Sequence, residues 1–261
     1  MKYWRTFLLT IQTELQYRAN LVLWIIEGAI APVVMVLAWF VVLGNRSEVG
    51  GYTRGDFITY YLAVTFGWYV VAGTFSQMIG RAIKMGEMNI TLVKPYNVVL
   101  EKMVREQAWK FISLLIALPI LAVVTYMFRS YVTVSLSGVQ IFMTMVSFAL
   151  GAILFAIIEA TIGILAFWFV EIWPIADTSM ACMNVFGGML APLTLMPIFF
   201  QRVAAYLPFK YVFFVPVSML LGKADNASFE LGLQLIFIVV CFGIYSLIWR
   251  AGLKRYEGIG G

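Results

Sequence analysis

Residues Val139–Phe169 read VQIFMTMVSFALGAILFAIIEATIGILAFWF and contain one charged side chain, Glu159. A helix needs roughly 20 consecutive apolar residues to cross a bilayer. The stretch is longer than that, so it predicts a transmembrane helix that tilts in the bilayer or protrudes from it. This segment alone places the chain among integral membrane proteins.

Apolar stretches on both sides of this segment predict an all-α, polytopic membrane protein with six transmembrane helices. The fifth span begins after Pro174 and is interrupted by small residues and prolines. The expected spans are Leu21–Leu43, Phe57–Ile79, Phe111–Phe128, Val139–Phe169, the fifth with Gly187, Gly188, Pro192 and Pro197 inside it, and Leu231–Trp249. Six spans use most of the chain, so we predict a single membrane domain over residues 21–261.

The overall composition agrees with this class and excludes several chemistries. Of the residues, 62% are hydrophobic and 12% are charged, whereas soluble domains carry about 25% charged residues. Histidine, the commonest metal ligand and general base, is absent. Cys182 and Cys241 both lie in apolar runs, where thiols act as small hydrophobic groups. We therefore predict no catalytic residue, metal site or cofactor site, and the sequence contains no P-loop with which to hydrolyse ATP.

The segment before the first span predicts an amphipathic helix over residues 3–18, within an N-terminal region of residues 1–20. Its apolar side chains recur at spacings of three and four, which is typical of one helix face. That face carries Trp4, Phe7, Leu8, Ile11 and Leu15, with Arg18 at its end. The other positions are too polar for a span, so we expect this helix to lie in the membrane interface.

The orientation follows from the basic residues near the span ends, because cytoplasmic loops carry an excess of Lys and Arg. With a cytoplasmic N-terminus, twelve of the 18 basic residues fall inside and six fall outside. Both termini and the polar residues 80–110 are therefore predicted to be cytoplasmic. Residues 199–229 are external in this topology, yet they are rich in Phe, Tyr and Leu. We expect them to return into the outer leaflet as re-entrant helices between the fifth and sixth spans.

Three acidic residues lie within or at the edge of apolar stretches, where a charge costs roughly 3 kcal/mol or more and marks a candidate site. Glu27 lies near the start of the first span, from which a carboxylate can reach the headgroups. Asp177 lies in the first turn of a helix, where it favours the helix dipole. We expect structural roles for both. Glu159 is deeper and shares a face with small residues, so two roles stay open: polar packing, or a place in a translocation path.

Four local patterns follow one another along the chain. They are MGEMNITLVKP at Met85–Pro95, GGMLAPL at Gly187–Leu193 followed by Pro197, Leu207-Pro208-Phe209 with Pro216 and Leu221-Gly222, and the ending LKRYEGIGG at Leu253–Gly261. Together they resemble the type-two ATP-binding-cassette (ABC) permease family, a class of six-helix exporters. Each pattern alone is loose, but all four occur in the family's order and spacing.

The resemblance implies a transmembrane permease subunit of an ATP-driven ABC exporter in the cell inner or plasma membrane. The chain would form the translocation path with a second permease, identical or homologous. Separate cytoplasmic ATPase subunits would bind ATP and Mg²⁺ and dock on residues 80–110, a coupling loop. The implied positions are Gly86, Glu87, Leu92, Lys94 and Pro95 for ATPase coupling, Glu159, Gly187, Gly188 and Pro192 for the path or the bundle, and Pro208, Phe209 and Pro216 for an external cap.

Other interpretations fit the same composition. The main alternative is a secondary transporter or channel that works without an ATPase, although proton coupling usually needs a chain of ionisable groups and the spans hold three candidate acids. An intramembrane enzyme is disfavoured because the spans lack histidine and paired aspartates. For residues 80–110, the alternative to a coupling loop is an ordinary solvated loop.

Overall fold

The computed structural model describes residues 2–16, 18–71, 73–87, 89, 97–131 and 137–256. In chain order the helices are α1 (Lys2–Gln16), α2 (Arg18–Leu43), α3 (Arg54–Val71), α4 (Phe75–Lys84), α6 (Val98–Met127), α7 (Gly138–Ile164), α8 (Trp173–Phe186), α9 (Ile198–Ala205), α10 (Phe214–Leu220) and α11 (Ala227–Arg255). Three short 3-10 turns are η1 (Leu165–Phe167), η2 (Leu193–Leu195) and η3 (Pro208–Tyr211). Strands β1 (Glu48–Val49) and β2 (Tyr52–Thr53) form an antiparallel hairpin.

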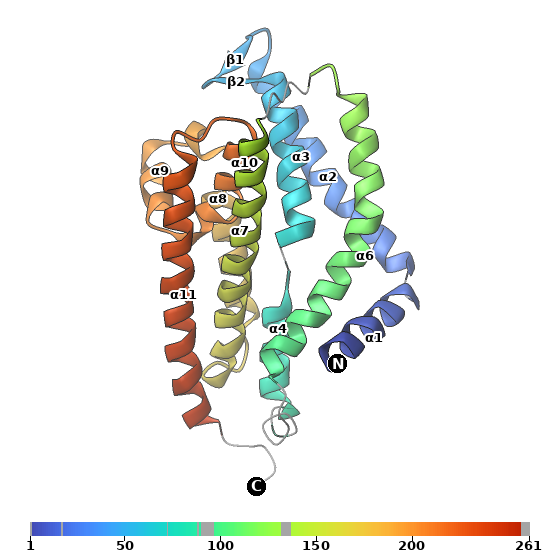
Figure 1. Ribbon diagram of the computed structural model, residues 1–261, viewed down its shortest axis with the longest axis vertical. Coiled ribbons are helices and arrows are strands. Elements are labelled where there is room, and N and C mark those ends of the chain that lie inside the picture. The colour runs from blue at the N-terminus through green and yellow to red at the C-terminus, as the bar shows by residue number, and fades with distance from the viewer. Residues whose placement is uncertain are drawn as a thin grey trace.

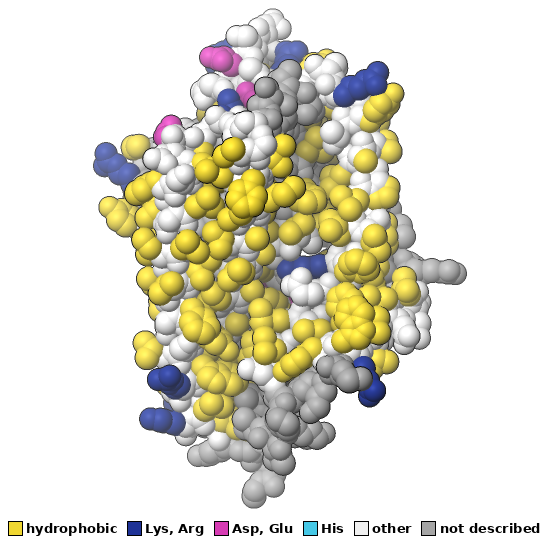
Figure 2. All heavy atoms as spheres, viewed as in Figure 1, with side chains coloured by type: hydrophobic (Ala, Val, Ile, Leu, Met, Phe, Trp, Pro, Cys, Tyr) yellow, Lys and Arg dark blue, Asp and Glu magenta, His cyan; other side chains and the backbone are white. Residues whose placement is uncertain are grey.

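The long helices run roughly along one axis, as Figure 1 shows. α1 and the C-terminal end of α11 lie toward the lower end of the view, and the β1–β2 hairpin lies at the upper end. α7 and α11 pack along each other, and α1 packs on α6. Apolar side chains cover the middle of the face seen in Figure 2, and Lys and Arg side chains gather near its two ends. This distribution fits a protein surrounded by lipid at mid-height.

Local sequence signals set where three of the long helices begin. Asn97 and Asn226 each accept a hydrogen bond from a backbone N–H in the first turn of α6 and α11, respectively. Ser137 and Gln140 form a reciprocal capping box at the start of α7. Such caps satisfy backbone donors that have no partner inside the helix.

Within the described residues, four helical segments are long and apolar enough to cross a membrane: Arg54–Lys84, Val99–Met127, Gly138–Phe167 and Ala227–Arg255. α9 and the segment Pro208–Leu220, bent by 82° relative to each other, add a fifth crossing if the pair counts as one span. α2 has 26 residues, and its C-terminal part, Val33–Leu43, is an apolar segment shorter than a full span. The all-α, polytopic membrane fold is confirmed, and the number of six spans stays a prediction.

Three expected boundaries differ from the structure. The segment predicted as a loop over residues 80–110 is helical at both ends, because α4 extends to Lys84 and α6 begins at Val98. The predicted second span is interrupted between α3 and α4. The fifth span is short, because the 14 residues of α8 rise about 21 Å, less than the hydrocarbon thickness of about 30 Å.

The segment that follows α9 forms the core of the upper half. Every residue from Tyr211 to Met219 is buried, and this run packs against α7 and α3. Gly151 of α7 permits the close approach, because a Cβ there would lie 2.8 Å from the carbonyl oxygen of Val212. Short helices are therefore present within residues 199–229, and the run from Tyr211 to Met219 is buried. Their re-entrant path through a bilayer stays a prediction.

Candidate functional site

A break in the Arg54–Lys84 span is the most unusual feature of the fold. α3 ends at Val71 and α4 begins at Phe75, and Gly73 and Thr74 between them are not helical. Gly73 is buried against α6, where a Cβ would lie 2.6 Å from Oε1 of Glu106. Non-helical backbone at membrane depth is tolerated only where protein or a water-filled cavity surrounds it.

Three charged side chains from neighbouring helices satisfy the backbone groups at this break. Nζ of Lys110 (α6) donates to the Val71 carbonyl at the end of α3, at 2.8 Å. The Ser76 N–H in the first turn of α4 donates to Oε2 of Glu159 (α7), at 3.2 Å. A backbone hydrogen bond also joins Thr74 to the Glu106 carboxylate. A cation thus lies at a helix C-terminus and an anion at an N-terminus, the arrangement that the helix dipoles favour.

These charges are buried and close enough to interact with one another. Glu159 is 4% exposed, and Glu106 and Lys110 are each 6% exposed. Lys110 interacts electrostatically with both carboxylates. Burying a charge is costly, and each of the three offsets part of that cost through a hydrogen bond to backbone at the break. We call Glu106, Lys110 and Glu159 the polar cluster.

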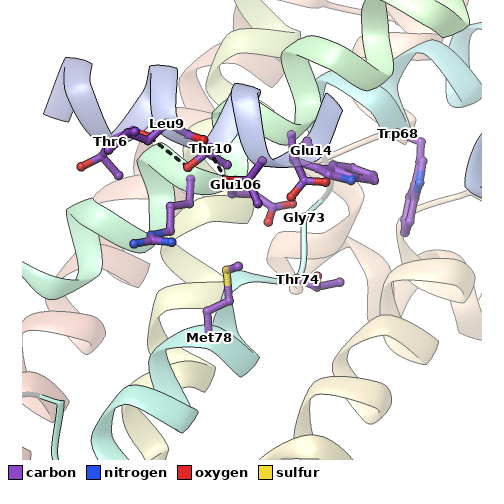
Figure 3. Close-up of a pocket in the computed structure, with 12 residues that line it drawn as sticks. Thr6, Leu9, Thr10, Glu14, Trp68, Gly73, Thr74, Met78 and Glu106 are labelled. Atoms are coloured by element: carbon purple, nitrogen blue, oxygen red, sulfur yellow. Dashed lines mark hydrogen bonds between the residues drawn. The ribbon is translucent and has the colours of Figure 1, made fainter. Parts of the chain in front are cut away.

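A cavity adjoins the polar cluster on the side of α1. Its volume is about 480 Å³, and its walls come from α1, α3, α4 and α6. Figure 3 shows α1 above it, with Glu14 and Glu106 close together beneath that helix and Gly73 and Thr74 on the opposite wall. Burial raises the pKa of the Glu14 carboxyl. The lining residues are Thr6, Leu9, Thr10, Thr13, Glu14, Trp68, Gly73, Thr74, Met78, Arg105, Glu106 and Trp109.

Helix α1 is held against α6 by side-chain contacts along its length. The rings of Phe7 and Phe111 lie 6.0 Å apart, and the Tyr3 hydroxyl accepts a hydrogen bond from the Asn97 N–H at 3.3 Å. The predicted amphipathic helix is therefore present, and part of its apolar face packs on protein. Trp4 and Leu15 on that face remain exposed.

The predicted coupling residues lie between α4 and α6. Gly86 has φ of +70° and ends the turn after α4, a conformation that glycine adopts without strain. The Glu87 carboxylate pairs with Nζ of Lys102 on α6 at 3.3 Å. Leu92, Lys94 and Pro95 lie outside the described residues.

The predicted path and cap residues lie away from the polar cluster, in the upper core. The Tyr60 hydroxyl donates to the Gly188 carbonyl at 2.5 Å, and the Tyr61 hydroxyl donates to the Leu190 carbonyl at 2.8 Å. These bonds tie the turn after α8, with Gly187, Gly188 and Pro192, to α3. Pro208 and Phe209 are half-buried in η3, and Pro216 is buried in the first turn of α10. The structure brings Glu159 to the break in the second span, but does not bring it to Gly187, Gly188 or Pro192.

The other two acidic candidates take different positions. Asp177 is exposed on α8, but α8 begins at Trp173 and has no acidic residue in its first turn. The predicted first-turn position of Asp177 is therefore wrong, because the helix begins before Pro174 and not after it. Glu27 lies in α2, and its side chain is outside the part of the chain that the structure describes.

Sequence reasoning missed Glu106, Lys110 and the break itself. It placed Glu106 and Lys110 in a cytoplasmic loop because residues 80–110 carry many charges. Their spacing of four residues, repeated at Glu101 and Arg105, is the helical spacing that signals one continuous helix. Asn97, a favourable N-cap residue, marks where that helix begins.

The protein is thus a multi-pass, all-α membrane protein in which charged side chains stabilise a break in one span. Residues 29–260 match the family described as "ABC-2 family transporter protein". The chain therefore belongs to the ABC-2 transporter family, and it is a membrane component of an ABC transport system. No curated protein matches the chain.

Proposed function

We propose that the chain is the permease subunit of an ATP-driven exporter, and the family match over residues 29–260 carries the proposal. A second permease chain, identical or homologous, completes the translocation path. Separate cytoplasmic ABC ATPase subunits bind ATP and Mg²⁺ and drive the cycle. Closure of the ATPase pair then shifts the permease between two arrangements.

The contacts at the lower end of the molecule support coupling through the turn after α4. Glu87 pairs with Lys102 on α6, and Lys84 pairs with Glu171 in the connection between α7 and α8. A force that a docked ATPase applies at this turn would therefore act on α4, on α6 and on the connection between α7 and α8. The same turn contains Gly86 and Glu87, which the family resemblance assigns to coupling.

The break gives this force a place to act. α4 has ten residues, and its covalent connection to α3 passes through the non-helical Gly73 and Thr74. Short rigid helices joined by such a segment move by changes in a few backbone dihedral angles. Displacement of α4 by the ATPase would change the contacts of Ser76 with Glu159, and with them the polar cluster.

The test is affinity purification of the chain in mild detergent, followed by identification of its partners and measurement of ATP-driven transport. Glu87→Lys should weaken capture of the ATPase by about tenfold, equivalent to roughly 1.4 kcal/mol, and should lower transport. Membrane abundance of the chain should not change. Glu48→Lys, an exposed charge reversal on the β1–β2 hairpin at the opposite end, is the matched control. Purification with no ATPase, or equal capture by Glu87→Lys and wild type, would argue against the proposal.

The polar cluster favours one alternative, a secondary transporter that works without an ATPase. Glu106, Lys110 and Glu159, with Glu14 nearby, form a series of interacting ionisable groups, and proton-coupled transport requires such a series. Liposomes that contain only this chain distinguish the two functions. Uptake driven by a pH gradient alone would favour the alternative, and uptake that requires added ATPase and ATP favours the exporter.

A further inference from the structure

The cavity beneath α1 combines charge and aromatic surface in a way that the transport cycle described above does not use. Its volume of about 480 Å³ is far larger than the roughly 30 Å³ that one water molecule occupies in the liquid. It lies beside the break, between α1 on one side and α3, α4 and α6 on the other. In Figure 2 the apolar face is hollowed at the height of the connection between α3 and α4.

Carboxylates outnumber cations at this cavity. Glu14 and Glu106 both line the cavity and interact electrostatically with each other, and Glu106 also interacts with Lys110 and Glu159 behind it. Arg105 also lines the cavity, but it pairs with Glu101 one helical turn earlier. Glu14 makes no hydrogen bond or ion pair with any residue in the described part of the chain. Away from bulk water, such an excess of negative charge favours a bound cation.

Two indole rings supply the rest of the recognition surface. Trp68 of α3 and Trp109 of α6 both line the cavity, and Trp68 is labelled on its wall in Figure 3. Tryptophan is the side chain that attracts organic cations most strongly through its ring face. Leu9 and Met78 add apolar contact.

We propose that this cavity binds an amphipathic organic monocation, with its charged group at Glu14 and Glu106 and its apolar body against Trp68 and Trp109. A metal ion fits less well, because the described residues contain no group of three or more His, Cys, Asp or Glu side chains arranged to hold one. The wide cavity and the aromatic walls suit a ligand with a ring system. Binding needs no ATPase subunit, so this proposal stands or falls separately from the exporter proposal.

The test is equilibrium binding of ethidium, a planar aromatic monocation, to the purified full chain in phosphatidylcholine nanodiscs. Saturable binding to the wild-type chain is expected. Glu14→Gln removes one charge without breaking a described contact, and it should weaken binding by about tenfold. Trp109→Leu should weaken binding by a similar factor through loss of the ring face. Glu48→Gln, on the distant hairpin, should leave the affinity unchanged.

Phenanthridine, an uncharged ring system of the same type, separates charge recognition from simple apolar binding. It should bind more weakly than ethidium, and its affinity should not respond to Glu14→Gln. Absence of saturable ethidium binding would overturn the proposal. Equal ethidium affinity in Glu14→Gln and wild type would also overturn it, because the charge of Glu14 would then make no contribution to binding. Comparable thermal melts of the variants confirm that each one is folded.

Discussion

At the residue scale, Glu159 is a buried carboxylate that contacts the start of a neighbouring helix. It accepts a hydrogen bond from the Ser76 N–H at the start of α4, and it interacts electrostatically with Lys110. The structure thus shows a polar packing contact for Glu159, and a place in a translocation path stays a prediction. A side chain that stabilises one position of α4 also influences how readily α4 moves.

Replacement of Glu159 tests that contact. Glu159→Gln keeps an oxygen acceptor for Ser76 and should be mild. Glu159→Leu leaves a buried backbone donor without a partner and removes a counter-charge from Lys110, so it should lower the free energy of unfolding by about 1–3 kcal/mol. Reversible unfolding in mixed micelles measures the difference. Equal stability of Glu159→Leu and the wild-type chain would show that the carboxylate is incidental.

At the element scale, the position of α4 depends on a close approach to α7. Gly163 of α7 lies against α4, where an added Cβ would be 2.8 Å from Cβ of Ile79 and 2.9 Å from the carbonyl oxygen of Ser76. Both distances are shorter than ordinary van der Waals contact. Because position 163 has no side chain, α4 lies close to α7. Ser76 of α4 is therefore within hydrogen-bonding distance of Glu159, which precedes Gly163 by four residues on α7.

Gly163→Ala should push α4 away from α7 and lower the free energy of unfolding by about 1–3 kcal/mol, the usual cost of overpacking. Gly243→Ala on α11 is the matched control, because a Cβ there meets nothing within 4 Å. Alanine favours a helix over glycine by about 1 kcal/mol at either site, so the control should be neutral or stabilising. If both variants had the same free energy of unfolding, the close packing of α4 on α7 would not require glycine at position 163.

At the scale of the whole molecule, the two ends of the bundle offer positions at which the orientation in the membrane can be tested. Lys84 ends α4 near the lower end in Figure 1, and Ser47 precedes the β1–β2 hairpin at the upper end. Both side chains are exposed. The excess of basic residues predicts that the end with Lys84 is cytoplasmic.

Single cysteines at these two positions test the orientation in intact cells, after Cys182 and Cys241 are replaced by alanine. An impermeant maleimide should label Ser47→Cys and should label Lys84→Cys only after the membrane is opened. Labelling of both positions from outside would overturn the assigned topology. Equal protein abundance of the two variants is the control for this comparison.

The sequence by itself determined the class of protein and much of its helical order. Long apolar runs such as Val139–Phe169 specify transmembrane helices, because they are long enough to cross the hydrocarbon core and a helix satisfies their backbone hydrogen bonds internally. The amphipathic spacing from Trp4 to Leu15 predicted α1. The local motifs predicted the family, which the match over residues 29–260 confirms. These features depend on composition and on neighbours close in sequence, so they can be read without a structure.

Only the tertiary structure decided the break in the second span and the polar cluster around it. The break at Val71, the α6 residues Glu106 and Lys110, and Glu159 of α7 are distant from one another in sequence. The three charged side chains are compatible with a bilayer because they hydrogen-bond to unpaired backbone groups at the break. The charges at the start of α6 indicated a cytoplasmic loop, because a sequence shows the cost of burying a charge but not the partner that offsets it. The cavity beneath α1 likewise exists only through the packing of four helices, which no local pattern specifies.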